Sequence, residues 1–444
     1  MILTALRGCF FCKVMPNAEE ILIKGGSVLI DGALTRADIH VRGGRVAAIG
    51  EDLPAPEGAR IIDATSLIVS AAFAEIHAHL REPGRPDKET IRTGTLAAAK
   101  GGYSVVCAMP NIDPVPDTPE HLAVEQAIIE RDAVIPVRPY AALTLGRKGQ
   151  ELVDMYALNL DCVAFSDDGS GVQSPEIMET AMRRAARLEC IIAAHCEDNS
   201  LLNGGYIHDG KYCAEHGHKG ICSESEWGPI QRDLALCEKY GTRYHVCHVS
   251  TAESVALIRD AKARGLRVTC ETAPHYLTLC DDDLQEDGRF KMNPPLRSAA
   301  DRDALIAGLL DGTIDCIATD HAPHTAEEKS KGLAGSAMGI VGLETSFPVL
   351  YTKLVRPGIL PLERLLVLMS DAPRRVFSLG GQLRVGCRAN LVLIDLEDCY
   401  RIDPDTFLSK GRSTPFAGME VYGRIRMTLA EGRIVYDYNN NQVS

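Results

Sequence analysis

SLIVSAAFAEIHAHLREPG, residues 66–84, is apolar for most of its length and ends in His77, His79 and Arg81. Side chains two positions apart on a strand point to the same face of the sheet. The two imidazoles and the guanidinium would therefore lie together at the carboxyl end of a buried strand. An apolar run of this kind, followed by polar groups with the strand period, predicts a strand that carries a functional site.

The same pattern recurs along the middle of the chain. Seven further runs begin apolar and end in polar residues: SVVCAMPN (104–111), VIPVRPYAALTLG (134–146), CVAFSDDG (162–169), CIIAAHCED (190–198), YHVCHVS (244–250), RVTCETAPHYL (267–277) and CIATDHAPH (316–324). Segments with helical periodicity, such as 174–189 and 253–265, lie between them. Eight strands in alternation with helices predict an α/β fold, a TIM-like (β/α)8 barrel over residues 67–374.

The two ends of the chain have a different texture. Residues 21–64 and 389–438 alternate apolar and polar residues and are punctuated by Gly-Gly, Asp-Gly and Glu-Gly turns, which is typical of β-hairpins. We expect these ends to pair into a small discontinuous β-domain formed by residues 21–66 and 375–444. Residues 1–20 would be an N-terminal extension.

Composition narrows the class of protein. The 444 residues carry 47 Lys+Arg against 60 Asp+Glu, a net charge of −13, with 45% hydrophobic and 24% charged residues. This is the balance of a globular protein, and its acidity argues against nucleic acid or anionic membrane as partners. The chain has no run near the roughly 18 apolar residues of a spanning helix. We expect a cytoplasmic protein that acts on a small metabolite.

Cysteine usage fits a reducing compartment. Many of the 15 cysteines lie inside apolar runs, where a thiol acts as a small hydrophobic group. Cys9 and Cys12 form an isolated C-x-x-C to which we assign no metal or redox role. Cys196 and Cys247 neighbour histidines of the predicted site, but adjacent strand positions face opposite ways, so packing is the favoured interpretation.

The polar residues at the strand ends would meet at one mouth of the barrel. They are His77, His79, Arg81, Asn111, Asp167, Asp168, His195, His248, His275, Asp320 and His324. Several imidazoles and carboxylates are costly to bury together unless a divalent metal satisfies them. The nitrogen and oxygen donors suit zinc, with manganese or cobalt as alternatives. One or two ions per subunit are expected, with two ions bridged by a carboxylate favoured.

These residues lie in segments that resemble the dihydroorotases of the amidohydrolase superfamily. The resemblance rests on AEIHAHLREPG (74–84), AMPN (108–111), AFSDDGSGV (164–172), AAHCEDN (193–199), HVCHVST (245–251), MNPPLR (292–297), TDHAPH (319–324), VGLET (341–345) and SKGRSTPFAG (409–418). It spans residue 21 to the C-terminus. One departure is Glu75 where the family has Asp, from which we expect altered packing of the first strand.

The resemblance implies a role for each matching position. His77, His79 and Asp320 would bind one metal, and His195 and His248 a second. Asp168 would bridge the two ions, with Asp167 as the alternative; hydantoinases and allantoinases use a carboxylated lysine there. Asp320 would also shuttle a proton from the attacking water to the leaving amide nitrogen. The substrate carboxylate would be bound by Arg81, Asn111 and His324, and its ring by Asn293, while His275 and His321 would only support the site.

The resemblance therefore implies a dihydroorotase, which interconverts L-dihydroorotate and N-carbamoyl-L-aspartate in the synthesis of UMP. The alternatives are another cyclic amidase of the hydantoinase or allantoinase type, and a catalytically silent structural partner of aspartate carbamoyltransferase. An active enzyme could form that complex too. We also expect a homodimer.

Two stretches outside the strands remain. Residues 201–229 hold His208, His216 and His218 in spacings that fit no zinc finger, and a long loop is the favoured interpretation. Residues 325–339 follow the last predicted strand and are rich in Lys, Gly and Ser. They would form either a mobile lid over the mouth or an ordinary solvated loop.

Overall fold

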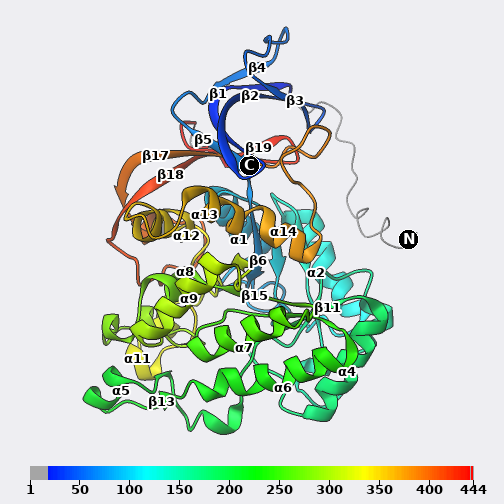
Figure 1. Ribbon diagram of the computed structural model, residues 1–444, viewed down its shortest axis with the longest axis vertical. Coiled ribbons are helices and arrows are strands. Elements are labelled where there is room, and N and C mark those ends of the chain that lie inside the picture. Colours follow the sequence, from blue (N-terminus) through cyan, green and yellow to red (C-terminus); the bar gives the residue numbers. More distant parts are fainter. Residues whose placement is uncertain (1–18, 441, 444) are drawn as a thin grey trace.

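The computed structural model describes residues 19–440 and 442–443. The prediction for Cys9 and Cys12 therefore lies outside the described residues. Figure 1 shows two parts: a β-layer in which the first and last segments of the chain lie together, and a larger body in which strands and helices alternate.

The β-layer is a nine-stranded sheet built from both ends of the chain. Its strands are β1 (Ile21–Ile30), β2 (Ala33–Arg42), β3 (Arg45–Gly50), β4 (Arg60–Asp63), β5 (Ile68–Ala71), β17 (Leu391–Arg401), β18 (Glu420–Ala430), β19 (Arg433–Asp437) and β20 (Gln442–Val443). The ends join where β5 pairs antiparallel with β17, with Val69 opposite Leu393. Both side chains are fully buried in one apolar cluster with Ile23 and Val28. The predicted pairing of the two ends is confirmed.

The larger body contains parallel strands. They are β6 (Phe73–Ala78), β7 (Tyr103–Ala108), β8 (Val137–Pro139), β9 (Ala141–Ala142), β10 (Phe165–Ser166), β11 (Ile191–Ala194), β14 (Arg243–Val246), β15 (Val268–Thr272) and β16 (Cys316–Ile317). One sheet has the order β6-β7-β8 and the other β16-β15-β14-β11-β10-β9. Beyond β16, His321 forms a parallel bridge with Ala78 of β6, and its carbonyl accepts the His79 N–H at 2.8 Å. Each of the eight predicted runs thus contributes to a parallel arrangement, and the α/β class is confirmed.

Helices connect these strands. They are α1 (Ile91–Lys100), α2 (Pro119–Asp132), α3 (Met155–Leu158), α4 (Pro175–Leu188), α5 (Lys211–His216), α6 (Glu224–Tyr240), α7 (Ala252–Ala263), α8 (Pro274–Thr278), α9 (Ala299–Asp311), α10 (Ala326–Lys329), α11 (Gly332–Gly335), α12 (Ser346–Leu350), α13 (Leu362–Met369) and α14 (Asp371–Phe377). Thr118 and Ser174 cap α2 and α4, each of which begins with proline, so local sequence sets where these helices start. In α4, Met178, Ala181, Met182 and Ala185 form the buried stripe that the helical period requires.

The segment 201–229 leaves the body as an excursion with its own small elements, α5 and the pair β12 (Ile207–His208) and β13 (Gly220–Ile221). His216 and His218 stack with Tyr212. His218 Nε2 also lies 2.6 Å from Glu286 Oε1. Aromatic and polar packing thus accounts for these histidines.

The segment 325–339 is fixed to the body by a buried lysine. Lys329 is 7% exposed. Its ammonium donates to the carbonyls of Lys291, Ala337 and Gly339 at 3.0, 2.7 and 2.7 Å. Leu333 is fully buried against the core. The segment is therefore anchored to the body, which argues against the ordinary solvated loop, while the mobile lid stays a prediction.

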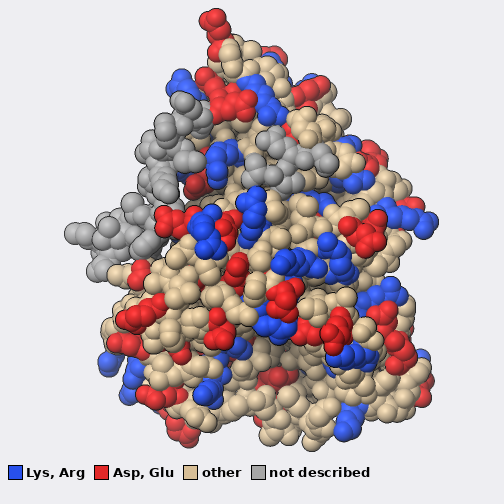
Figure 2. Space-filling view, turned by 180° about the vertical axis from the view of Figure 1, so that it is seen from behind, with Lys and Arg blue, Asp and Glu red and all other residues tan. Residues whose placement is uncertain are grey.

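Charged side chains of both signs are interspersed over the face shown in Figure 2. Within the described residues, no helix has the length and apolar character needed to cross a membrane. None of the cysteines among those residues is joined in a disulfide.

A buried arginine joins the two parts of the molecule. Arg374 of α14 donates to the carbonyl of Ala72, between β5 and β6, at 3.0 Å and to Ser104 Oγ of β7 at 2.6 Å. Its other terminal nitrogen donates to the Gly380 carbonyl at 2.9 Å. One guanidinium thus satisfies acceptors on three segments that meet between the β-layer and the body.

Replacing Arg374 with methionine should destabilise the fold. The acceptors on Ala72, Ser104 and Gly380 would lose a charged donor, at a cost of about 3 kcal/mol. The matched control is Arg375→Met, because the next arginine of α14 is exposed and its replacement should change stability by less than about 0.5 kcal/mol. Thermal unfolding of both variants measures the difference, and equal melting temperatures would contradict this role of Arg374.

Candidate active site

Six candidate residues meet at the carboxyl ends of the parallel strands. His77 is in β6 and His79 follows it, while Asp168, His195, His248 and Asp320 follow β10, β11, β14 and β16. None of the six is more than 6% exposed. They come from five separate segments, so the strand arrangement alone brings them together.

Asp168 lies at the centre of this cluster. Its Oδ1 is 3.3 Å from His77 Nε2, 3.3 Å from His248 Nε2 and 3.7 Å from His195 Nδ1. Its Oδ2 is 3.4 Å from His79 Nε2. One carboxylate therefore faces all four imidazoles.

Asp320 is the second carboxylate near two of these histidines, His77 and His79. Its Oδ1 lies 3.1 Å from His79 Nε2 and 3.6 Å from His77 Nε2. Burial raises the pKa of Asp320, but the hydrogen bond with His79 and the nearby imidazoles lower it, so the net shift is downward. Asp320 is thus an ionised acceptor at neutral pH.

Two acceptors outside the cluster fix how the first two imidazoles are oriented. His77 Nδ1 is 2.6 Å from Glu271 Oε1, and His79 Nδ1 is 2.7 Å from Asn111 Oδ1. Because these oxygens accept, each Nδ1 carries a proton and each Nε2 points at the two carboxylates. Burial lowers the pKa of His77, but Asp168 and Glu271 raise it well above its usual value. The centre of the cluster therefore favours a positive charge.

The donor set fits a metal. Two groups of three ligand atoms lie within 4.8 Å of one another, His77 with His79 and Asp168, and Asp168 with His195 and His248. Within the described part of the chain, His77 Nε2 is buried without a hydrogen-bond partner. A ring nitrogen in that state, aimed at two carboxylates, is the environment a divalent cation would satisfy. Asp168 belongs to both groups.

The neighbouring Asp167 is turned away from the cluster. Its Oδ1 accepts the N–H groups of Leu143 and Thr144 at 2.9 and 3.0 Å, and its Oδ2 accepts the Thr144 hydroxyl. It thereby fixes the loop that follows β9. Of the two aspartates in SDDG, the structure brings Asp168 to the histidines.

The backbone at three of these positions is strained. Arg81, His248 and Asp320 have φ values of 60°, 35° and 48°, in the left-handed region that non-glycine residues rarely occupy. Such conformations persist where the surrounding structure imposes them, and they concentrate at functional sites. Here they aim three polar side chains at one space.

Arg81 and Asn293 lie beside the cluster. Arg81 Nε donates to the Pro323 carbonyl at 3.3 Å, and burial lowers the pKa of its guanidinium to about 10, so it stays charged at neutral pH. Asn293 Nδ2 donates to Glu197 Oε1 at 2.9 Å. Its Oδ1 is buried without a partner among the described residues.

His324 lies at the edge of the site. Its Nε2 is 2.8 Å from the Met338 carbonyl. Its Nδ1 is 3.1 Å from both Lys88 Nζ and Glu328 Oε2. Both ring nitrogens thus have protein partners.

The remaining histidines and the cysteines of these segments pack around the cluster. His321 Nε2 is 3.2 Å from Glu89 Oε2. Burial lowers the pKa of His275 to about 4, so it is neutral. Cys196 Sγ is 3.2 Å from the Tyr244 hydroxyl. Ligand atoms of Cys247, His77 and Glu271 lie within 4.8 Å of one another. Burial raises the pKa of the Cys247 thiol to about 12.

Sequence reasoning missed Glu271 and underrated Glu75. Glu271 stands in TCET near the end of a predicted strand. Its position as a carboxylate at a strand end is the sequence feature from which a role at the site could have been predicted. Glu75 is fully buried and accepts the N–H groups of His77 at 2.8 Å and Thr319 at 3.1 Å. It therefore ties β6 to the segment that carries Asp320, a role that its neighbours in sequence could not reveal.

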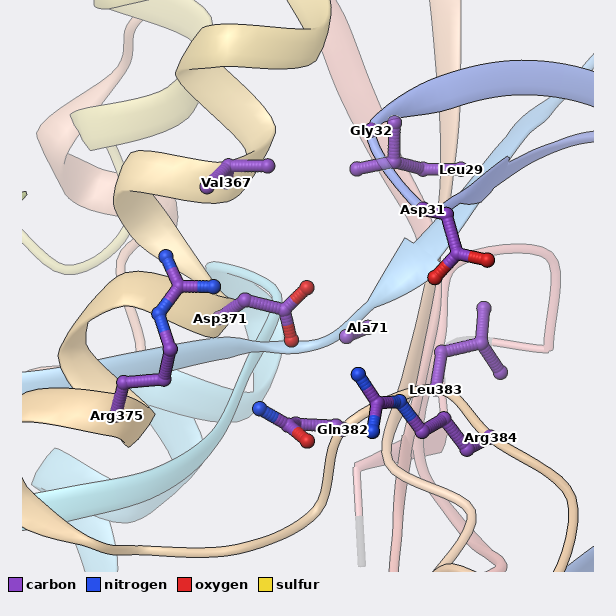
Figure 3. Close-up of a pocket in the computed structure, with 10 residues that line it drawn as sticks. All are labelled: Leu29, Asp31, Gly32, Ala71, Val367, Asp371, Arg375, Gln382, Leu383 and Arg384. Carbon is purple, nitrogen blue, oxygen red and sulfur yellow. The ribbon is translucent and has the colours of Figure 1, made fainter.

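A cavity of about 270 Å³ lies at the other end of β6. Figure 3 shows it between the β1–β2 turn, β5 and the α13–α14 region. Its lining residues are Leu29, Asp31, Gly32, Ala71, Val367, Asp371, Arg375, Gln382, Leu383 and Arg384. It shares no residue with the cluster around Asp168, which leaves that cluster as the candidate active site.

Three comparisons relate this chain to known proteins. A family model described as Dihydro-orotase-like matches residues 66–254. The chain is 51% identical over 419 residues to a dihydroorotase of Geobacillus sp. (strain WCH70), covering 94% of this chain and 98% of that protein. It is 49% identical over 419 residues to a dihydroorotase of Bacillus cytotoxicus, with the same coverage. The structure resembles an L-hydantoinase (dihydropyrimidinase) from Arthrobacter aurescens, with a TM-score of 0.86, 27% identity and coverage of 96% and 97% of the two chains.

Glu271→Gln should weaken metal binding by about 10- to 100-fold, because the amide cannot hold the His77 N–H as a carboxylate does. Glu125→Gln is the matched control. Glu125 is another buried glutamate, outside the cluster, and burial raises its pKa so that it is uncharged. Titration of each metal-free variant with Zn²⁺ measures the affinity. Equal affinities would contradict the role of Glu271.

Proposed function

The chain belongs to the dihydroorotase family, and we propose that the cluster around Asp168 is the metal centre at which its reaction takes place. The activity is the reversible hydrolysis of L-dihydroorotate to N-carbamoyl-L-aspartate, a step of pyrimidine synthesis. The observation that carries the site assignment is the single carboxylate of Asp168 facing four imidazoles at 3.3–3.7 Å.

We propose that the centre holds two zinc ions. His77, His79 and Asp320 would bind one ion, His195 and His248 the other, and Asp168 both. The two groups of ligand atoms that share Asp168 support this division. The bound metal supplies a Lewis acid for the ring amide and makes a water acidic enough to attack it near neutral pH.

Asp320 would transfer the proton that this reaction requires. An amide nitrogen leaves poorly unless it is protonated as the C–N bond breaks. Asp320 faces the same histidine nitrogens as Asp168, and its lowered pKa keeps it ready to accept a proton from the attacking water. Delivery of that proton to the leaving nitrogen completes the ring opening.

The substrate carboxylate would bind beside the metal centre. Arg81 offers a fork of donors that fits a carboxylate, and Asn111 is already oriented through its hydrogen bond with His79. His324 would add the third donor. Asn293, whose Oδ1 has no partner among the described residues, would contact the ring.

We also propose how the chain is organised. The parallel strands from β6 to β16 would close into a (β/α)8 barrel through the Ala78–His321 bridge. The sequence places the small domain at residues 21–66 and 375–444 and the catalytic barrel at residues 67–374. Because β5 pairs with β1 and β17, we assign the residues up to Ala71 to the small domain instead of the barrel. The family resemblance is the ground for proposing a cytoplasmic homodimer that can associate with aspartate carbamoyltransferase.

Ring opening of L-dihydroorotate, compared with hydantoin and allantoin, tests the substrate on one purified sample whose metal content is also determined. Turnover of dihydroorotate alone with two zinc ions per chain supports the proposal. Turnover of hydantoin or allantoin instead would move the enzyme to another class of cyclic amidase. A fully metal-loaded protein that opens none of the three would favour the silent structural partner.

Asp320→Asn should abolish turnover, with a loss of at least about 10³-fold, because the amide cannot accept the proton. Thermal unfolding should remain close to wild type. Metal content is measured on the same sample, so that a lost ion is not mistaken for a lost proton acceptor. Wild-type turnover in this variant would remove Asp320 as the proton shuttle.

Arg81→Lys should raise the KM for dihydroorotate by about tenfold or more, because an ammonium cannot reproduce the two parallel hydrogen bonds of a guanidinium. Arg85→Lys, in the same loop, is the matched control, since Arg85 is exposed and pairs with Asp87. Steady-state kinetics of both variants give the comparison. An unchanged KM in Arg81→Lys would contradict carboxylate binding there.

A further inference from the structure

Lys88 lies beside the candidate site and has no role in the reaction described above. It belongs to the loop between β6 and α1 and is 9% exposed. Its Nζ is 3.1 Å from His324 Nδ1 and 2.9 Å from Glu328 Oε1. A lysine buried between an imidazole and a carboxylate affects which ring nitrogen carries a proton and keeps the carboxylate ionised.

The partners of His324 determine which ring nitrogen carries the proton. Nε2 lies 2.8 Å from the carbonyl oxygen of Met338, which can only accept, so Nε2 is the N–H. The ammonium of Lys88 can only donate, so its contact requires a lone pair on Nδ1. A neutral imidazole with one proton, on Nε2, satisfies both contacts.

Glu328 offers His324 a competing arrangement. Its Oε2 is also 3.1 Å from Nδ1, but this contact becomes a hydrogen bond only if Nδ1 is protonated and the ring is an imidazolium. Glu328 already has other donors, since Lys88 lies at 2.9 Å, Arg85 at 3.3 Å and the Thr325 N–H at 3.2 Å. The hydrogen bonds to the Glu328 carboxylate are therefore supplied without a donor from the imidazole.

The charges around His324 favour the neutral ring. Arg81 and Lys88 face it as cations and Glu328 as an anion, while burial lowers the pKa of the nearby Lys329 to about 7. Burial, and then the cations Arg81 and Lys88, lower the pKa of His324 to about 4. Burial raises the pKa of Glu328, but the hydrogen bonds from Lys88 and Thr325 lower it to about 2, so this carboxylate is ionised.

We propose that Lys88 is a positioning residue that holds His324 as the neutral tautomer with its proton on Nε2. The Nε2–H that Met338 now accepts is then the donor offered to the substrate carboxylate. This inference rests on the proposed function, which assigns that contact to His324. Without Lys88, Nδ1 takes up a proton from solvent and donates a hydrogen bond to Glu328, so that the ring becomes an imidazolium.

Four full-length proteins test this in the reaction: wild type, Lys88→Met, Glu328→Gln and the double variant. The ratio of kcat/KM in Lys88→Met to that in wild type should change about tenfold as the pH crosses about 6.5, the ordinary pKa of histidine. The ratio of kcat/KM in the double variant to that in Glu328→Gln should stay constant over the same pH range, because His324 Nδ1 then has no carboxylate to pair with. A fifth protein, Lys88→Arg, keeps a cationic donor and should show the wild-type profile. A constant ratio in Lys88→Met would overturn the proposal.

Nuclear magnetic resonance of the ring nitrogens of His324 in wild type gives a second test that needs no variant of Lys88. The assignment comes from His324→Gln, whose spectrum lacks that ring. We expect an unprotonated Nδ1 that does not titrate above about pH 5. Protonation of Nδ1 at neutral pH would overturn the inference. If His324→Gln leaves KM unchanged, the substrate role of His324 fails, and the spectrum still decides what Lys88 does.

Discussion

The central constraint on this molecule is the burial of Asp168 and Asp320 among four imidazoles. Ionised carboxylates removed from water are costly unless positive charge and hydrogen bonds compensate them. The protein supplies the compensation in layers. The imidazoles face the carboxylates, and Glu271 and Asn111 hold two of those rings so that Nε2 points inward. The same arrangement leaves nitrogen and oxygen donors converging on one space, which is what a divalent cation requires.

The rest of the fold keeps these groups in place. They come from the ends of five strands or from the segments just after them, and strained backbone at His248 and Asp320 turns the side chains inward. Glu75 ties β6 to the segment that carries Asp320, because its carboxylate accepts the Thr319 N–H. At the opposite end of β6, Arg374 links the strands to the β-layer. Backbone order at the site therefore depends on buried polar contacts at both ends of one strand.

The segment 325–339 lies beside the candidate site and is held in place by hydrogen bonds. Lys329 holds residues 325–339 to the body through three carbonyls, which places the Met338 carbonyl against His324. Lys88 reaches the same imidazole from the loop after β6. The two lysines have different roles. Lys329 holds the backbone of residues 325–339, whereas Lys88 sets which ring nitrogen of His324 carries the proton. Substrate recognition would thus depend on residues that do not touch the substrate.

The α/β class, the pairing of the chain ends and the positions of the candidate ligands could be predicted from the residues alone, because strand period and polar strand ends are local patterns. Motifs such as HLREPG and DHAPH added the family, which the comparisons confirm. Which of the two adjacent aspartates meets the histidines could not be predicted in this way, since it depends on the loop after β9, whose N–H groups donate to Asp167. The tertiary structure also showed that Glu271 orients His77 and that Lys88 and Glu328 compete for His324. These contacts join residues far apart in the chain, and no local pattern records a distance between them.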